Sequence, residues 1–167
     1  LSNITIMIPF CRTVEELKKV YTVMEKYGLQ RGEDGLQVYL MAEIPSNILM
    51  AEEFAEHIDG FSIGSNDLTQ LTLGLDRDSS LVAHIYDERN PAVKRSISNL
   101  IKTAKKTKTK VGICGQGPSD YPDFAQFLVE EGIDTISVTP DSVLKTIKAI
   151  DKIESKNIVI KKEVSLA

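Results

Sequence analysis

The sequence predicts an α/β protein built from parallel βα repeats, and three observations lead to this prediction. Short apolar runs alternate along the chain with longer segments whose apolar residues recur at helical spacing. The helical segments carry capping signals, such as Thr13-Val-Glu-Glu16 and Asn90-Pro91. The apolar runs end in small or polar residues. Buried strands alternating with amphipathic helices imply a parallel sheet with right-handed crossovers, either doubly wound or a segment of a barrel.

Taken in order, the predicted elements alternate regularly. The predicted strands cover residues 3–9, 36–44, 60–65, 110–115 and 133–138. The predicted helices run from Thr13 to Tyr27, over 48–57, from near Leu68, from Asn90, and from Asp120 to a C-terminal stop at Gly132, and Thr139-Pro140 caps the last one. We expect residues 1–155 to form one domain and residues 156–167 to be a C-terminal tail.

Composition restricts the function classes. With 167 residues, of which 42% are hydrophobic and 26% charged, the chain is long enough for one core. The net charge of −4 argues against a nucleic-acid surface, which needs a basic face. We found neither an apolar run of membrane-spanning length nor a signal peptide, so we expect a soluble cytoplasmic protein. The two cysteines, Cys11 and Cys114, are expected to be free thiols.

The stretch 60–70, Gly-Phe-Ser-Ile-Gly-Ser-Asn-Asp-Leu-Thr-Gln, is the strongest candidate for a site. Its apolar strand breaks at Gly64, which allows backbone to approach a ligand closely. Ser65, Asn66 and Asp67 then offer backbone N–H groups, polar side chains and one carboxylate. Such a segment can bind a small carboxylate on its N–H groups and a divalent cation on Asp67. The alternative is a polar turn that caps the following helix.

Other strand ends carry polar chemistry as well. In a parallel sheet of either kind, ligands bind at the carboxyl ends of the strands. The segments that this chain puts there are Pro9-Phe-Cys-Arg12, Met41-Ala-Glu43, Gly64-Ser-Asn-Asp67, Gly112-Ile-Cys114-Gly-Gln116 and Val138-Thr-Pro140. We therefore expect one polar face at this end of the sheet.

These segments resemble a known family. Met-Ile-Pro-Phe, Met-Ala-Glu-Ile-Pro-Ser-Asn, Gly-Ser-Asn-Asp-Leu-Thr-Gln and Gly-Ile-Cys-Gly-Gln-Gly-Pro-Ser-Asp stand in the order and spacing of the phosphoenolpyruvate-utilising enzymes. The last of them is most similar to the phosphoenolpyruvate synthases. The resemblance runs nearly from Ile4 to Ile150 and implies the later five strands of a (β/α)8 barrel that binds phosphoenolpyruvate and pyruvate. It also implies that the chain is a fragment, inactive alone.

The resemblance also implies roles for individual residues. Glu43 and Asp67 would be ligands of Mg²⁺, with substrate oxygens and water completing its coordination. Cys114 would be the acid/base that moves a proton at the methyl or methylene carbon. The residues implied to bind substrate are Met41, Gly64, Ser65, Asn66, Asp67 and Arg12. The chemistry of the residues agrees, because a cation held by two carboxylates can stabilise the enolate of pyruvate as a Lewis acid.

Some of these residues also have other interpretations. Cys114 can instead be a small buried hydrophobe at a strand end, which is the role we assign to Cys11. Neither His57 nor His84 receives a role. Arg77 and Arg12 both lie near the predicted ligand face, where an arginine can bind phosphate.

For the whole protein, the resemblance implies conversion of pyruvate, ATP and water to phosphoenolpyruvate, AMP and phosphate. Its partners would be phosphohistidine and ATP-grasp domains outside this sequence and further copies in a homo-oligomer. One alternative is another Mg²⁺-dependent enolate barrel of the aldolase or lyase type, with a base other than Cys114. The other is a folded assembly module without activity.

Overall fold

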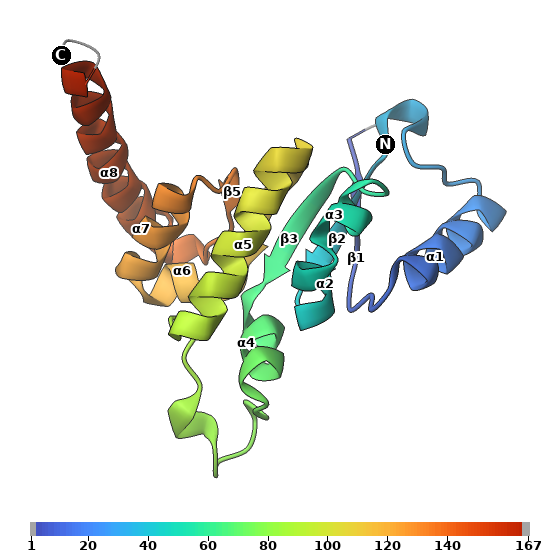
Figure 1. The fold of residues 1–167 in the computed structure, drawn as a ribbon, viewed down its shortest axis with the longest axis horizontal. Coiled ribbons are helices and arrows are strands. Elements are labelled where there is room, and N and C mark those ends of the chain that lie inside the picture. The colour runs from blue at the N-terminus through green and yellow to red at the C-terminus, as the bar shows by residue number, and fades with distance from the viewer. Residues whose placement is uncertain (1–2, 165–167) are drawn as a thin grey trace.

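The computed structural model describes residues 3–164, with side chains described as far as residue 155. Five strands form one parallel sheet in the order β1-β2-β3-β4-β5 (Figure 1). Their bounds are Thr5–Ile8, Gln37–Ala42, Gly60–Gly64, Lys110–Cys114 and Thr135–Ile136. Every strand pairs with its neighbour in sequence, whereas a doubly wound sheet reverses its order at a switch point. The predicted α/β fold of parallel repeats is confirmed, and its strand order is that of a barrel segment.

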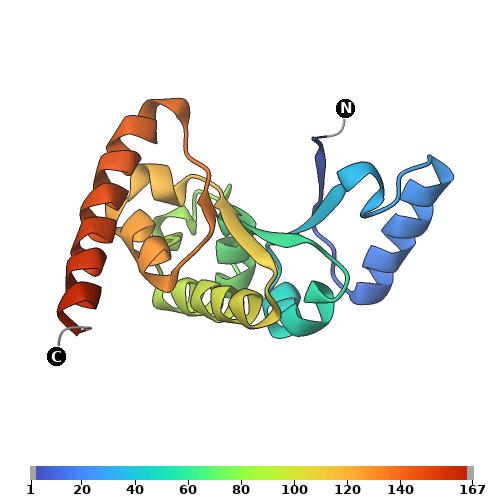
Figure 2. The same cartoon turned by 90° about the horizontal axis from the view of Figure 1, so that it is seen from above.

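Eight α-helices connect or follow the strands in the described part of the chain. They are α1 (Val14–Lys26), α2 (Pro45–Leu49), α3 (Ala51–Ala55), α4 (Ser65–Leu73), α5 (Pro91–Thr107), α6 (Gly117–Asp120), α7 (Pro122–Glu131) and α8 (Val143–Val164). Figure 2 shows α1, α5 and α8 around the outside of a curved sheet whose inner side is open. This one-sided cover is what right-handed crossovers between successive neighbouring strands produce.

The predicted helix boundaries at Thr13, Asn90 and Gly132 are confirmed. The Thr13 hydroxyl accepts the N–H of Glu16 over 3.1 Å at the start of α1. The side-chain oxygen of Asn90 accepts the N–H of Ala92 over 2.9 Å at the start of α5. Gly132 ends α7 in the left-handed region, with φ of 82°.

Other boundaries differ from the prediction. The helix expected over 48–57 begins already at Pro45 and breaks at Met50 into α2 and α3, because Pro45 is well suited to a first helical position. The strand expected over 133–138 pairs with β4 only at Thr135 and Ile136. Helix α8 continues across residue 156 to Val164, and residues 165–167 lie outside the described part, so the expected division of the chain at residue 156 stays a prediction.

Side chains alternate between the two faces of the sheet. Those that point toward the helices are buried, and they include Val38, Leu40, Ala42, Phe61, Ile63, Val111 and Ile113. The opposite face carries Met7 and Tyr39, paired in the register, and Met7 is 42% exposed. Cys11 is buried in the helix-side core, as assigned, and both cysteines are free thiols. Among the described helices, none is long and apolar enough to cross a membrane.

The outer strand β1 leads to a prediction about assembly. Among the strands that the structure describes, β1 pairs only with β2, and its sequence Thr-Ile-Met-Ile carries no charge that would discourage pairing with another chain. The isolated 167-residue chain is therefore expected to self-associate at micromolar concentration, as sedimentation velocity would show. A cooperative monomer with slow amide exchange in Thr5–Ile8 would contradict this prediction.

Candidate functional site

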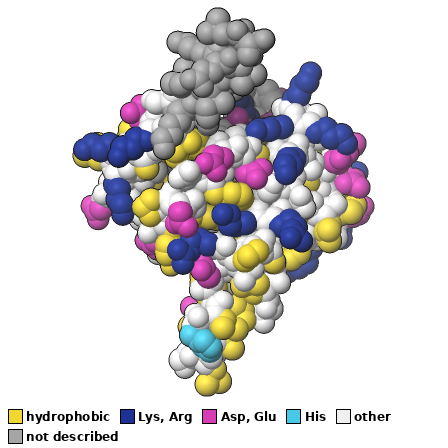
Figure 3. All heavy atoms as spheres, turned by 60° about the vertical axis from the view of Figure 1, so that its left-hand side comes forward, with side chains coloured by type: hydrophobic (Ala, Val, Ile, Leu, Met, Phe, Trp, Pro, Cys, Tyr) yellow, Lys and Arg dark blue, Asp and Glu magenta, His cyan; other side chains and the backbone are white. Residues whose placement is uncertain are grey.

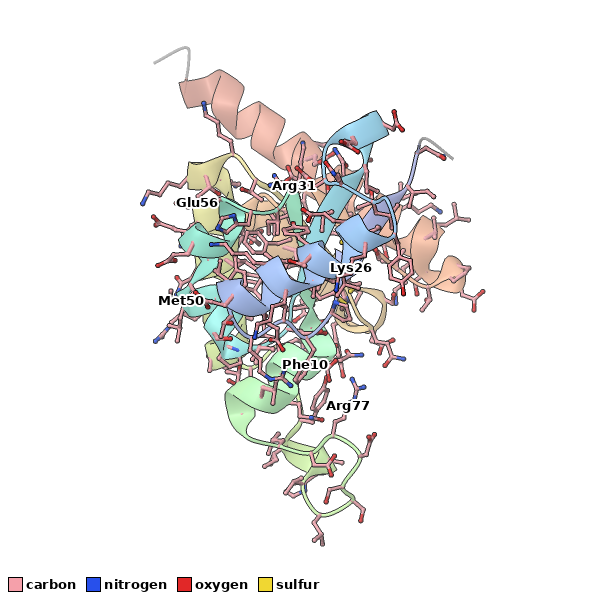
Figure 4. The ribbon with its side chains drawn as sticks, turned by 90° about the vertical axis from the view of Figure 1, so that its right-hand side faces the viewer. Phe10, Lys26, Arg31, Met50, Glu56 and Arg77 are labelled. Carbon is pink, nitrogen blue, oxygen red and sulfur yellow. The ribbon has the colours of Figure 1, made fainter. Side chains whose placement is uncertain are left out.

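The register brings the predicted site residues into adjacent rows at the carboxyl ends of the strands. Met41 of β2 is opposite Ser62 of β3. One step further along the same face, Gly64 is opposite Cys114 of β4. In Figure 4 Phe10, which follows β1, and Arg77, which follows α4, lie toward this end of the molecule, and Arg31 lies toward the other.

Glu43 follows β2 directly and is only 3% exposed. Its Oε1 accepts the backbone N–H of Phe10 over 2.7 Å, so Oε2 points toward Gly64. A Cβ atom at Gly64 would lie 2.6 Å from Oε2, and glycine is therefore required here. Burial raises the pKa of the Glu43 carboxyl, the Phe10 N–H opposes the rise, and the charge on Asp67 adds to it. The two carboxylates are thus close enough to interact.

Two residues hold Glu43 in this position. Phe10 has a φ of 49°, a conformation that costs a non-glycine residue about 1 kcal/mol and is often found at functional sites. Asn47 is fully buried, and its Oδ1 accepts the N–H groups of Glu43 over 3.3 Å and Ile44 over 3.1 Å. Its Nδ2 donates to the carbonyl of Cys11 over 2.7 Å. Asn47 therefore ties the end of β2 to the segment after β1.

Ser65, Asn66 and Asp67 form the first turn of α4 rather than a loop before a helix that starts near Leu68. This corrects the predicted helix start. The first N–H groups of a helix have no partner within it and carry partial positive charge. Because α4 begins directly at the end of β3, these groups are available for an anion at the strand end.

Cys114 ends β4 and is partly exposed. The Ser62 hydroxyl donates to its Sγ over 3.5 Å, and the Ser65 hydroxyl donates to its carbonyl oxygen over 3.2 Å. The next residue, Gly115, has a φ of 127°, and a Cβ atom there would collide with the Ser65 hydroxyl. The thiol is thus held beside the first turn of α4.

The two arginines near the ligand face differ. Arg12, which precedes α1, forms an ion pair with Glu16 in the first turn of α1, Nη1 to Oε1 over 2.9 Å, and its guanidinium lies over the Phe10 ring. The structure does not bring it to the other predicted substrate ligands. Arg77 approaches the site. Its Nη1 donates to the side-chain oxygen of Asn66 over 3.3 Å, in the amide orientation that satisfies the hydrogen bonds of Asn66.

Sequence reasoning assigned no role to Glu88, which lies beside this site and is only 4% exposed. Burial raises the pKa of its carboxyl, the Ser65 hydroxyl opposes the rise, and the charge on Asp120 adds to it. Glu88 also lines a cavity of about 450 Å³ together with Asn66, Arg77 and Gln116. The Asp87-Glu88-Arg89 sequence gives no signal of burial, whereas Asn47 lies within a segment already singled out.

The described residues contain no group of three or more His, Cys, Asp and Glu side chains that could bind a metal. His57 follows α3 and His84 lies in the 3₁₀ turn Ala83–Ile85, so neither joins the two carboxylates. Glu43 and Asp67 remain as a pair. Mg²⁺ is typically bound by one or two carboxylates, with substrate and water as the other ligands, so a pair of this kind fits it.

A parallel α/β segment with this polar strand-end face matches a known domain. Residues 1–155 match the family model described as the PEP-binding domain of PEP-utilising enzymes. The chain therefore belongs to the PEP-utilising enzyme family.

Curated relatives of the chain are phosphoenolpyruvate synthases. The chain is 68% identical over 161 residues to the phosphoenolpyruvate synthase of Aquifex aeolicus, a match covering 96% of this chain and 19% of the relative. It is 59% identical over 146 residues to that of Escherichia coli, covering 87% of this chain and 18% of the relative. The chain thus spans about a fifth of the length of these relatives.

Solved structures share the fold at low identity. A HpcH/HpaI aldolase/citrate lyase family protein from Burkholderia cenocepacia aligns with a TM-score of 0.59 at 18% identity, over 90% of this chain and 65% of the other. A citrate lyase from Burkholderia xenovorans aligns with a TM-score of 0.61 at 15% identity, over 87% of this chain and 48% of the other. At these identities the likeness concerns the fold alone.

Proposed function

We propose that this chain provides the pyruvate- and phosphoenolpyruvate-binding site of a phosphoenolpyruvate synthase. One observation carries the proposal: two interacting carboxylates, Glu43 and Asp67, a free helix N-terminus and the Cys114 thiol share one end of the sheet. The names of the relatives support the same function.

In this proposal the first turn of α4 binds the substrate carboxylate. The N–H groups of Ser65 and Asn66 point along the helix axis toward the strand end, where the helix dipole favours negative charge. Gly64 leaves room for the Glu43 carboxylate beside this turn, and the Met41 side chain lies against Gly64 as well. Pyruvate would thus be oriented by backbone groups that cannot change their protonation state.

Glu43 and Asp67 would bind Mg²⁺, and Oε2 of Glu43 is the atom free to do so, because Oε1 is occupied by Phe10. When bound, the cation would supply Lewis-acid stabilisation of negative charge on the substrate oxygens. The raised pKa of the Glu43 carboxyl has burial as its main cause, and a positive charge nearby would favour its ionised form.

Cys114 would act as the base. Its thiolate takes a proton from the methyl group of pyruvate, and the electron pair of that C–H bond passes into the enolate. The enolate oxygen then accepts the phosphoryl group from a phosphohistidine. The hydrogen bond from the Ser62 hydroxyl would hold Sγ of Cys114 on the face of the sheet that also carries Met41. In the reverse direction the thiol returns the proton to the methylene carbon.

The complete reaction needs more than this chain. The proposal includes phosphohistidine and ATP-grasp domains that turn ATP and water into AMP, phosphate and the phosphohistidine. It also includes a homo-oligomeric enzyme of the cytoplasm.

The proposal is tested in a chimaera of the Aquifex aeolicus relative in which this chain replaces the matching segment. The unsubstituted chimaera should exchange the methyl protons of pyruvate with deuterated water in the presence of Mg²⁺, as followed by NMR. Cys114→Ser should abolish the exchange, because serine is a far weaker base at neutral pH. Cys11→Ser, which changes the core cysteine, is the matched control and should retain it.

The outcomes separate the alternatives. Exchange that persists in Cys114→Ser would indicate an enolate barrel with another base, of the aldolase or lyase type. A folded chimaera without any exchange would indicate an assembly module and would refute the proposal.

Asp67→Asn should reduce Mg²⁺-dependent exchange by about 100-fold, since it removes one charge that would hold the cation. The circular dichroism spectrum should not change, because asparagine is also compatible with the first turn of a helix. Asp123→Asn, at a carboxylate on the surface of α7, is the control with the same chemical change and should exchange at the parent rate. An Asp67→Asn variant with the parent rate would reduce Asp67 to a helix-capping role.

A further inference from the structure

The segment between α4 and α5 leaves the body of the protein and returns to the site. In Figure 1 it projects beyond the ends of the strands, and Figure 3 shows hydrophobic side chains along this projection. Leu81 is 82% exposed there. Only six residues further on, Asp87 is half-buried and Glu88 is almost fully buried. The exposed part thus leads directly into a buried carboxylate.

On one side, Glu88 contacts the first turn of α4. The Asn66 amide nitrogen, in the orientation that satisfies its hydrogen bonds, donates to Oε1 of Glu88 over 2.9 Å. The Ser65 hydroxyl lies against the same carboxylate. Tyr86, two residues before Glu88, adds a hydrogen bond from its hydroxyl to the carbonyl of Asn66 over 3.3 Å.

On the other side, Glu88 contacts the turn after β4. The Glu88 carboxylate lies against the backbone at Gly117, because a Cβ atom at Gly117 would lie 2.7 Å from Oε2, and the Gly117 N–H opposes the rise in the pKa of this carboxyl. Gly115 is also close, since a Cβ atom there would lie 3.5 Å from Oε1. This turn follows Cys114 directly, and its glycines allow the carboxylate to approach the backbone.

We propose that Glu88 is a positioning residue that fixes the distance between the substrate-binding turn of α4 and the Cys114 thiol. This inference rests on the proposed function of both groups. One buried carboxylate contacts the two segments at once, through the Asn66 amide on one side and the backbone at Gly117 on the other. The covalent path between the two segments runs through the whole of α5 and β4. Without the Glu88 carboxylate, the two segments are joined near the site by the Ser65 and Ser62 hydroxyls.

The expected effect concerns proton transfer more than substrate binding. A displacement of about 1 Å between a bound substrate and its base can cost about 100-fold in rate. Glu88→Ala removes the carboxylate that contacts both segments, whereas Glu88→Gln keeps the side-chain shape and one acceptor oxygen. We expect kcat for pyruvate proton exchange to fall about 10- to 100-fold in Glu88→Ala and less than about 10-fold in Glu88→Gln. The KM for pyruvate should change less than kcat in both.

The experiment uses the same chimaera with these two variants and Asp87→Asn. Asp87 is the matched control, because it is the adjacent carboxylate and lines the same cavity, but within the described part of the chain it pairs with Arg89 over 3.0 Å and its side chain makes no hydrogen bond to the first turn of α4 or to the turn after β4. A second readout is the rate at which iodoacetamide alkylates Cys114, measured by peptide mass spectrometry without substrate. This rate should change at least about 3-fold in Glu88→Ala and remain at the parent value in Asp87→Asn.

Parent kcat and parent alkylation rate in Glu88→Ala would overturn the inference. If Glu88→Ala fails to fold, Glu88→Gln decides: an intermediate kcat with unchanged KM supports positioning, and a parent kcat contradicts it. Loss of exchange in the unsubstituted chimaera would instead refute the proposed function, and the alkylation rates would still show whether Glu88 positions Cys114.

Discussion

The register of the parallel strands is the constraint on which the rest of the site depends. Pairing of Ala42 with Ile63 sets Glu43 beside Gly64, and pairing of Gly64 with Cys114 brings the thiol to the same row. Because side chains alternate along a strand, a shift of one residue in β4 would turn Cys114 toward the helices and Ile113 toward the site. The buried Val111 and Ile113 of β4 oppose such a shift, since it would turn them away from the core.

Buried polar groups then fix what the strands bring together. Asn47 joins the ends of β1 and β2, and Glu88 joins the ends of β3 and β4. Each is a polar side chain in a nearly water-free position, where a hydrogen bond is costly to lose. Phe10 adds a strained backbone whose N–H holds Glu43. The site is therefore supported by interactions among loops that lie far apart in the sequence.

Much of the fold and part of the site followed from local sequence patterns. Caps at Thr13 and Asn90 and the C-terminal stop at Gly132 are short-range signals, and strand ends could be recognised by a change from apolar to polar residues. Glu88 could not be recognised in this way, because it is buried only where the projecting segment between α4 and α5 returns to the body of the protein. Arg12 was expected to bind substrate, and in the structure its guanidinium pairs with Glu16 of the helix that follows it, so its predicted role stays a prediction. Local pattern thus predicted elements well and long-range polar contacts poorly.

The central claim is that Glu43 and Asp67 bind a cation together with a substrate on the first turn of α4. A crystal structure of the chimaera with Mg²⁺ and oxalate, a planar analogue of the pyruvate enolate, tests it most directly. The account predicts carboxylate oxygens of both residues at about 2.0–2.1 Å from the metal. It also predicts an oxalate oxygen on the N–H groups of Ser65 and Asn66, with Sγ of Cys114 over the position of the methyl carbon. A metal bound by neither Glu43 nor Asp67, or oxalate bound away from the carboxyl ends of the strands, would contradict the account.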